Sequence, residues 1–470
     1  MGRNSVFQDG FGTTVTNDGV SICRQINPEN GFEAIGADLI KQASEKTNEE
    51  AGDGTTTSIV LAHAIIEEGL KELATGESPI VIKKKLEEAQ EVAIAQLKGL
   101  AKEISDDSDV LSVAKISVED DHIADVVSSA MKRAGKNGAV IVEYGMGYNV
   151  EKEEVDGYFW DKGYVSPYMA TNEKMEATME NPMVILTDKN LNLNSELVEI
   201  MNSIISTGNK NVLLVSDNVE GELLATLIVN KMKNIINVVA VRRPHTIEEL
   251  EDLAIMTGAT AVTKEKDIRK FDMSHIGHAI KVIVKKDNTT VIGQETQALK
   301  DRIQELRTQL DLDKDNEKLK ERLAKLANGI VVLKVGAKTE SDREYLKLKV
   351  DDAVGACRAA LEEGVVVGGG VTLRDIGEKS SYEPFKRALR RPYTKILENA
   401  GIVDDGKNYN VKTGLVVKDL IKEGIIDPAK VTRCVIENAV SLAKTFLTIE
   451  SAIVEIEQPQ ESAQKGKNHF

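Results

Sequence analysis

The stretch of sequence that decides the fold is AGDGTTTSIVLAHAIIEEGL, residues 51–70. It joins a glycine turn and three consecutive threonines to a segment in which Ile59, Ala62, Ile66 and Leu70 recur at helical spacing. Glycines let the backbone approach an anion, and the hydroxyl and amide groups at a helix start can donate hydrogen bonds to phosphate oxygens. We therefore predict a phosphate-binding turn that leads into an amphipathic helix.

The GDGTTT turn also has interpretations other than a phosphate site. A threonine-capped helix after a glycine turn explains the DGT triplet at least as well when that triplet is taken alone. A Walker A loop is excluded, because no GKS or GKT follows the glycines. Asp53 would repel bare phosphate, but its carboxylate can hold a magnesium ion that bridges to phosphate. The triple threonine favours a phosphate site with Asp53 as its metal ligand.

A second glycine-rich segment, KVDDAVGACRAALEEGVVVGGGVTL, covers residues 349–373. The three glycines at 368–370 follow a β-branched run and permit close approach to a ligand, although a tight strand-to-helix turn is about as well supported. We expect Asp351 and Asp352 at the start of a helix, where a carboxylate either caps the helix or orients an attacking water.

Outward from these segments, the sequence pattern predicts a helical domain that encloses an α/β module. Residues 36–100 are apolar at helical spacing, and a second helix-rich region begins near residue 349. Between residues 135 and 262, short β-branched runs alternate with polar turns and helical stretches. Residues 299–326 carry two apolar stripes separated by DLDKDNEK, which predicts a helical hairpin.

Composition excludes several classes of protein. The chain has 470 residues, 41% of them hydrophobic, which is enough for several domains with their own cores. A net charge of -16 argues against nucleic-acid or anionic-membrane partners. No segment approaches the roughly 20 apolar residues of a membrane span. Three scattered cysteines without a CxxC pair indicate a reducing compartment, and we expect the cytoplasm.

The two glycine-rich segments together resemble the signature stretches of the group I chaperonins, the bacterial and organellar 60 kDa folding machines. The resemblance continues through TNDGVS, DKGYVSPYM, VEGELLATLIVN, LAKLANGIVVLKVGA, YNVKTG and IIDPAKVTR, in the family's order and over nearly the whole chain. It implies a multidomain α/β fold with a mostly helical equatorial domain split across both termini, a hinge-like intermediate domain and an inserted α/β apical domain. The implied boundaries are 1–99 and 363–470 for the equatorial domain, 100–155 and 331–362 for the intermediate domain, and 156–330 for the apical domain.

The resemblance also implies an ATP-hydrolysing site with Mg²⁺, and with K⁺ as a further candidate cofactor. Carried over by motif, the nucleotide-binding positions are Asp18, Asp53, Gly54, Thr55, Thr56, Thr57, Gly368, Gly369, Asn410 and Asp427. Asp53 would hold the metal, and Asp352 would position or activate the hydrolytic water. These two carboxylates are the catalytic residues that the resemblance implies.

For the substrate, the resemblance implies an exposed apolar surface that captures non-native polypeptides and also receives a small lid cochaperonin. Its positions would be Tyr164, Tyr168, Met169, Leu224, Leu227, Ile228, Leu250 and Leu253. Taken alone, the leucines and Ile228 form helical stripes that are more often part of a core. The expected assembly is a homo-oligomer of stacked seven-membered rings in which ATP-driven rotation of the apical domain encloses the client.

The sequence departs from the family at its start. The family has a preceding segment that ends in a Thr-Leu-Gly-Pro-Lys-Gly turn, whereas this chain begins at Met1, so we expect an N-terminally truncated member. Asn17 replaces a lysine of the family. These departures support an alternative, an ATPase-impaired homologue or incomplete subunit that acts as a binding or scaffold protein. A metabolic kinase that uses the glycine loops ranks last, because no small-substrate cluster of Arg, Lys or His accompanies them.

Overall fold

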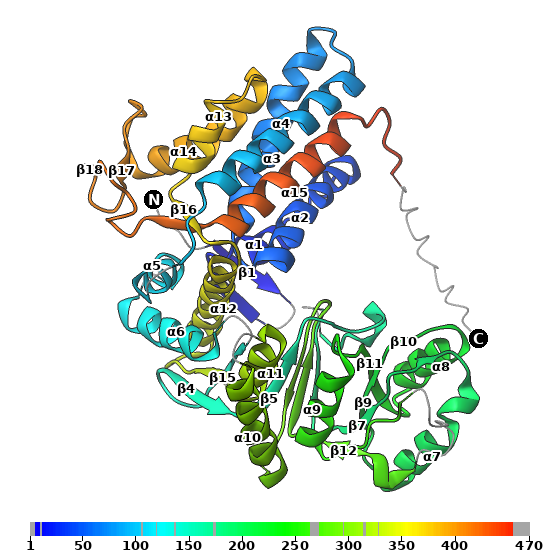
Figure 1. Ribbon diagram of the computed structural model, residues 1–470. Coiled ribbons are helices and arrows are strands. Elements are labelled where there is room, and N and C mark those ends of the chain that lie inside the picture. Colours follow the sequence, from blue (N-terminus) through cyan, green and yellow to red (C-terminus); the bar gives the residue numbers. More distant parts are fainter. Residues whose placement is uncertain are drawn as a thin grey trace, which may run out of the picture. The chain divides into compact units, whose positions relative to one another are not determined.

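The computed structural model describes residues 5–9, 12–104, 107–118, 120–135, 138–172, 175–263, 272–294, 296–313, 316–327 and 329–454. The chain divides into two compact units (Figure 1). Unit 1 comprises Met1–Ser128 and Lys338–Phe470, and unit 2 comprises Ser129–Ala337. Among the described helices, none combines the length and apolarity that a membrane crossing requires.

Unit 1 is mainly helical. Its helices are α1 (Gly19–Arg24), α2 (Gly31–Ala51), α3 (Thr55–Ala74), α4 (Pro79–Leu100), α5 (Asp107–Val118), α12 (Glu340–Glu363), α13 (Val371–Gly377), α14 (Glu383–Ala400) and α15 (Ala429–Leu447), and α6 (Asp121–Ala134) continues into unit 2. Three antiparallel pairs complete it, namely β1 (Ser5–Asp9) with β2 (Gly12–Thr16), β16 (Val365–Val367) with β19 (Ile426–Pro428), and β17 (Tyr409–Asn410) with β18 (Leu415–Val416). Helices α2, α3 and α4 pack around α15, α14 packs on α3, and their apolar faces form one core (Figure 1).

Glycines set the start of α3. Gly52 ends α2 in the left-handed conformation (φ 69°), and Gly54 has φ 84° immediately before the first turn of α3. A side chain at Gly52 would place its Cβ 2.8 Å from the Cα of Gly355 on α12. Because only glycine meets both demands at low cost, the turn is fixed in place between two helices.

Unit 2 is built on three sheets. Strands β11 (Asn237–Arg242), β9 (Asn211–Ser216), β7 (Met183–Leu186) and β12 (Gly277–His278) form one sheet, whose first three strands are parallel. Strands β5 (Gly157–Trp160), β14 (Thr289–Ile292), β13 (Lys281–Val284) and β6 (Ala177–Glu180) form an antiparallel sheet, and β3 (Ala139–Tyr144), β15 (Ile330–Val335) and β4 (Val150–Val155) form a mixed one. The short strands β8 (Asn190–Leu191) and β10 (Asn218–Val219) pair separately.

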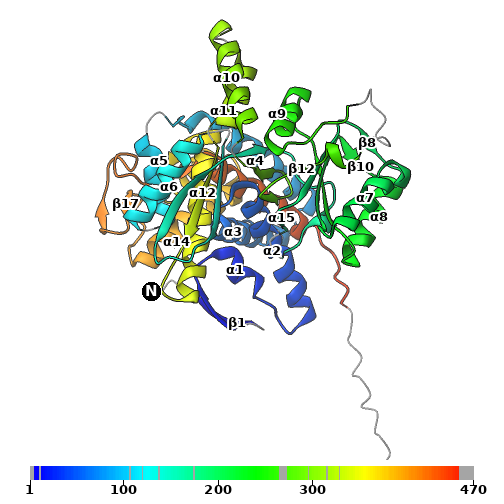
Figure 2. The same ribbon diagram turned by 90° about the horizontal axis from the view of Figure 1, so that it is seen from below.

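Helices α7 (Val198–Thr207), α8 (Gly221–Met232) and α9 (Ile247–Thr257) alternate with the parallel strands, and Figure 1 shows α9 on one face of that sheet with α7 and α8 on the other. Short 3₁₀ turns are η1 (Pro167–Met169), η2 (Asn194–Glu196) and η4 (Met273–His275). Helices α10 (Gln297–Leu312) and α11 (Glu317–Ala327) lie side by side in both views, so the predicted hairpin is confirmed (Figures 1 and 2).

The predicted fold class is confirmed, since an α/β unit interrupts a mostly helical unit formed from both ends of the chain. The division into three domains stays a prediction. The two-unit partition assigns α5 and α12 of the predicted intermediate domain to unit 1 and the sheet β3-β15-β4 to unit 2.

Candidate functional site

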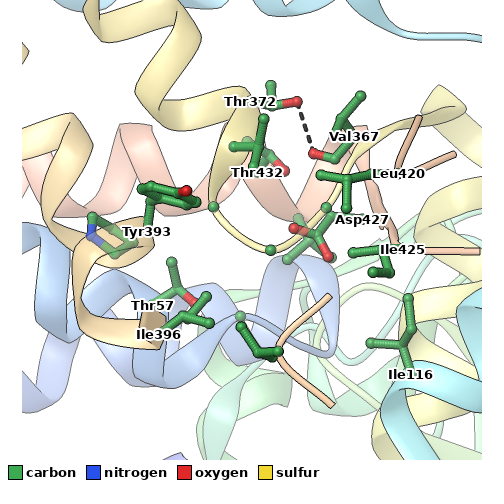
Figure 3. A pocket seen from close by; sticks show the side chains of 18 of the residues that line it. Thr57, Ile116, Val367, Thr372, Tyr393, Ile396, Leu420, Ile425, Asp427 and Thr432 are labelled. Carbon is green, nitrogen blue, oxygen red and sulfur yellow. Dashed lines mark hydrogen bonds between the residues drawn. The ribbon is translucent and has the colours of Figure 1, made fainter. Parts of the chain in front are cut away.

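A cavity of about 1010 Å³ lies in unit 1, where the start of α3 meets α5, α12, α14 and the loops around β16 and β19 (Figure 3). The residues of the predicted nucleotide site that line it are Asp53, Gly54, Thr56, Thr57, Asp352, Gly368, Gly369, Asn410 and Asp427. They come from segments as far apart as residues 53 and 427, so the fold brings together what the sequence separates.

Asp18 and Thr55 are the two predicted nucleotide-site residues that do not line the cavity. Both side chains are buried. Asp18 caps α1 by accepting hydrogen bonds from the amides of Val20 (3.3 Å) and Ser21 (2.9 Å). A Cβ on Gly19 would lie 2.3 Å from Oγ1 of Thr56, so the start of α1 packs directly behind the start of α3.

The glycine loop after β16 closes another side of the cavity. Gly369 and Gly370 adopt left-handed φ values of 68° and 77°. Their backbone amides donate hydrogen bonds to Asp427, and a Cβ on Gly368 would come 2.9 Å from Oδ1 of the same residue. Thr372 follows in α13 and donates to the carbonyl of Val367 (2.8 Å; Figure 3). The glycines thus bring backbone without side chains close to the Asp427 carboxylate.

Carboxylates dominate the electrostatics of the cavity. Burial and the charge of Asp53 raise the pKa of Asp427 to about 7. Burial, followed by the charges of Asp53 and Asp18, raises the pKa of Asp352 well above its ordinary value. Burial also raises the pKa of Asp53, although the Gly54 amide donates to its Oδ1 (2.5 Å). These groups repel one another and disfavour their own ionised forms.

The residues present fit a magnesium ion and a phosphate chain. A divalent cation would relieve the repulsion among the carboxylates, and carboxylate and hydroxyl oxygens are hard ligands of the kind that Mg²⁺ prefers. The unpaired amides at the start of α3 and the hydroxyls of Thr56 and Thr57 offer donors to phosphate oxygens beside them.

Apolar side chains also line the cavity. Figure 3 shows Leu420 and Ile425 beside Asp427 and Ile396 beside Thr57, together with Ile116 and the ring of Tyr393. Such side chains can pack against a flat apolar group such as a nucleobase.

Sequence reasoning missed Lys349, which lines the cavity from α12 three residues before Asp352. Its charge lowers the pKa of both Asp53 and Asp352 against the larger effect of burial. The spacing of i and i+3 on one helix could have revealed it. The prediction that Asp351 and Asp352 begin a helix was wrong, because Thr339 caps α12 and the helix starts at Glu340. Both aspartates lie in its middle.

The predicted substrate residues in unit 2 divide into buried and accessible ones. Tyr164, Met169, Leu227, Leu250 and Leu253 belong to the hydrophobic core, so these side chains offer no surface in this structure and the core interpretation holds for them. Periodicity alone cannot distinguish a core face from an exposed apolar face.

The accessible members are fewer. Tyr168 is 70% exposed, and Leu224 and Ile228 on α8 are half-buried. Sequence reasoning missed Met232 and Ile235, which continue the spacing of Leu224 and Ile228 and are exposed.

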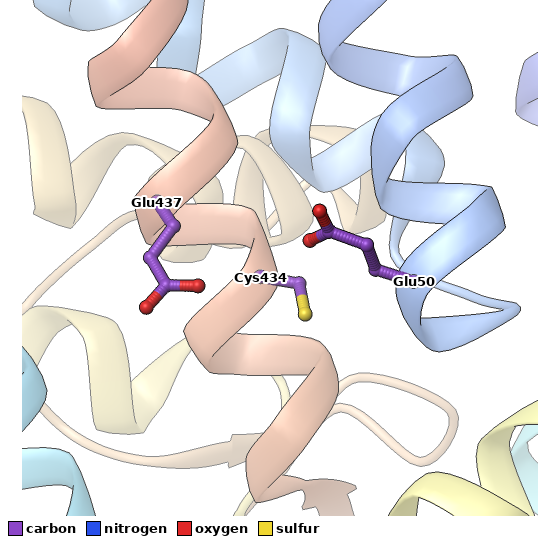
Figure 4. A group of neighbouring side chains, drawn as sticks. All are labelled: Glu50, Cys434 and Glu437. Carbon is purple, nitrogen blue, oxygen red and sulfur yellow. The ribbon is translucent and has the colours of Figure 1, made fainter. Parts of the chain in front are cut away.

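A separate group, Glu50, Cys434 and Glu437, brings ligand atoms within 4.8 Å of one another (Figure 4). Burial raises the pKa of the Cys434 thiol to about 12, and Glu437 accepts an ion-pair hydrogen bond from Arg433 (2.7 Å). A thiol ligand must be deprotonated to bind metal, so we assign this group to packing between α2 and α15.

The chain is similar to a known protein family and to solved structures. The family model of the TCP-1/cpn60 chaperonin family matches residues 1–457. Two crystal structures of the chaperonin gp146 from bacteriophage EL 2 (Pseudomonas aeruginosa), both in the presence of ATP-BeFx, are similar in fold. The first has a TM-score of 0.67 at 19% identity and covers 95% of this chain and 92% of that one. The second has a TM-score of 0.62 at 20% identity and covers 97% and 94%.

Proposed function

The chain belongs to the TCP-1/cpn60 chaperonin family, and we propose that it is an ATP-dependent molecular chaperone that captures non-native polypeptides and promotes their folding in a ring chamber. Family membership supports the chaperone function. The observation that carries the ATP dependence is the cavity of unit 1, where mutually repelling carboxylates face a glycine-flanked helix start.

In this proposal, the start of α3 binds the phosphates through its free amides and the hydroxyls of Thr56 and Thr57. Asp53 holds Mg²⁺, which when bound neutralises charge that develops on the transferred phosphoryl group. The glycine loop at 368–370 lets the nucleotide lie against backbone, and Asn410 borders it from the β17–β18 hairpin.

Asp352 is the proposed general base. Its carboxylate accepts a hydrogen bond from the attacking water and takes its proton. A raised pKa makes a carboxylate a stronger base, and Asp352 has that property through burial and its acidic neighbours. The positive charge of Lys349 favours the ionised form of Asp352 against the larger effects of burial and of the Asp53 and Asp18 charges.

Client capture is proposed for the accessible apolar side chains of unit 2, namely Tyr168 and the stripe Leu224, Ile228, Met232 and Ile235. Apolar surface binds unfolded chains without a sequence requirement, because the hydrophobic effect is non-directional. The proposal includes stacked seven-membered rings, a small lid cochaperonin that competes for the same surface, and action in the cytoplasm.

A second candidate is a scaffold protein that binds polypeptides without hydrolysing ATP. One observation favours it. Asn17 carries no charge, and its side-chain amide donates to the hydroxyl of Tyr345 (3.2 Å) instead of extending a cation toward phosphate.

Steady-state ATP hydrolysis by the full chain tests the two candidates. We expect measurable turnover that falls by about 10²- to 10⁴-fold in Asp352→Ala, the usual loss when a general base is removed. Glu340→Ala is the matched control on the same helix, since Glu340 is exposed and does not line the cavity. Equal background rates in all three proteins would support the scaffold instead.

A further inference from the structure

Helix α8 of unit 2 carries a lysine, Lys231, whose hydrogen-bond partners among the described residues are neutral. Lys231 Nζ donates to the carbonyl of Met169 (2.9 Å), to Oδ1 of Asn237 (3.1 Å) and to the carbonyl of Val238 (3.3 Å). An ammonium group has three N–H donors, so these neutral acceptors use all of them. The side chain is half-buried.

One of these bonds anchors Lys231 to the parallel sheet. Asn237 begins β11 and donates through Nδ2 to Oδ1 of Asn211 (2.8 Å), and Asn211 donates in turn to the carbonyl of Glu180 (2.8 Å). Because each amide nitrogen already has an acceptor, the oxygen of Asn237 is the group that faces Lys231. The ammonium of Lys231 therefore has a fixed position at the start of β11.

Another bond reaches a separate segment of the chain. Met169 ends the short turn η1, and its side chain is fully buried while the preceding Tyr168 is 70% exposed. The carbonyl of Met169 is the group that Lys231 holds. Lys231 lies in the last turn of α8, three residues after the half-buried Ile228 and next to the exposed Met232, with which the helix ends. A single ammonium thus joins the Tyr168 turn to the apolar stripe of the helix.

We propose that Lys231 is a positioning residue that joins η1 and α8 into one continuous surface for extended apolar segments of non-native polypeptides. The proposal rests on the proposed chaperone function and extends it to a residue that need not touch the client. The buried side chains of Met169 and Leu227 hold η1 and α8 in the core, and the bonds of Lys231 would add a direct link between the backbone of η1 and the end of α8.

The test measures binding of reduced, carboxymethylated lactalbumin, a soluble non-native chain, to the full-length protein and its variants. Lys231→Met keeps the length of the side chain and removes all three donors, and Lys233→Met is the matched control on an exposed lysine of the same region. We expect Lys231→Met to weaken binding about tenfold, the scale of one lost hydrogen bond to a charged group. Lys233→Met should leave binding unchanged.

A double-mutant cycle with Tyr168→Ala separates positioning from a general structural role. If Lys231 positions Tyr168, then Tyr168→Ala weakens binding in the unaltered and Lys233→Met proteins but has little further effect in Lys231→Met. Additive losses would overturn the proposal.

Hydrogen exchange of the Met169 and Ala170 amides supplies a readout that needs no client. These amides donate to the carbonyls of Ser166 and Pro167 within η1. Protection lost in Lys231→Met but kept in Lys233→Met supports the proposal, and equal protection overturns it. An unaltered protein that fails to bind lactalbumin while these amides lose protection in Lys231→Met would count against the proposed client capture alone.

Discussion

The two units of this protein withdraw carboxylates from solvent in opposite ways. In unit 2, Asp252 is fully buried and accepts hydrogen bonds from Arg302 (2.9 Å) and Arg322 (2.8 Å), while Glu249 pairs with Lys325 (2.5 Å). In unit 1, the described residues supply no ion pair to the three carboxylates in the wall of the cavity, namely Asp53, Asp352 and Asp427, and the pKa of each is raised.

The two groups of buried carboxylates differ in whether the protein supplies positive charges to neutralise them. The unit 2 cluster supplies its own counter-charges and joins the hairpin α10–α11 to α9, so it needs no ligand to be neutral. The unit 1 cluster keeps a charge imbalance that an external cation would correct. Buried acids without partners are therefore a better indicator of a ligand site than buried acids as such.

Breaking the neutral cluster should have the largest effect on stability. Asp252→Ala removes the shared acceptor of the partly buried Arg302 and Arg322, although Arg302 keeps Glu305 (2.7 Å), and we expect it to lower the free energy of unfolding by about 3 kcal/mol. Denaturant titration followed by fluorescence of Trp160, the one tryptophan and a core residue of unit 2, measures this loss. The neighbouring exposed acid provides the control, because Glu251→Ala should change stability by less than about 0.5 kcal/mol. Similar losses in both variants would contradict the contrast.

Removing the nearest positive charge from the unbalanced cluster should affect ligand binding more than stability. Lys349→Gln is expected to weaken ATP binding about tenfold, since a hydrogen bond to a charged group contributes about 1.5–3 kcal/mol, and Lys349→Arg should retain most of the affinity. Isothermal titration calorimetry measures it. Lys347→Gln is the control on the same helix, because that ammonium pairs with Asp351 outside the cavity. Unchanged affinity in Lys349→Gln would show that the cavity does not use this charge.

The smallest expected effect is a pH dependence of melting temperature that Mg²⁺ removes. The pKa of Asp427 is about 7 in the folded chain against an ordinary 3.8, so the native state holds a proton that the unfolded state releases. Stability from this group is full below the ordinary pKa and falls as the pH rises through the folded pKa. Thermal unfolding in EDTA should therefore show a melting temperature that decreases from pH 5 to pH 8, and excess Mg²⁺ should raise it more at pH 8.

Asp427→Asn separates this effect from other titrations. The variant should lose part of the pH dependence in EDTA, whereas Asp419→Asn, a change at an exposed acid outside the cavity lining, should keep it. A Mg²⁺ effect of the same size at both pH values would argue against a cation at this cluster.

Much of this site could be predicted because its geometry depends on glycine and on helix starts. GDGTTT and the glycines at 368–370 require backbone conformations that few other sequences adopt, so their local shape follows from the residues. Lys349 could not be identified in that way, since its importance depends on the acids that the fold places around it. Asp352 was predicted by resemblance while its place in the helix was predicted wrongly, because the capping pattern of Thr339 and Asp342, which starts the helix well before Asp351, was overlooked.

Unit 2 shows the limit of pattern reasoning. Leu227, Leu250 and Leu253 share their spacing with Leu224 and Ile228, yet the first three lie in the core and the others reach the surface. Nothing in the sequence distinguishes Lys231 from a surface lysine. Which face of a helix meets a sheet is decided by tertiary packing, and single-residue roles on that face follow from it.

The contact between Gly52 and Gly355 has a mechanical consequence. Elsewhere in the core, side chains can change rotamer and absorb a small displacement of a neighbour. Here the turn before α3 meets α12 backbone to backbone, with no side chain between them. A displacement of that turn toward α12, such as one driven by phosphates at the start of α3, is therefore passed to α12 as a rigid push. The contact between Gly52 and Gly355 borders the proposed nucleotide site, and it is stiff because neither residue has a side chain that could change rotamer.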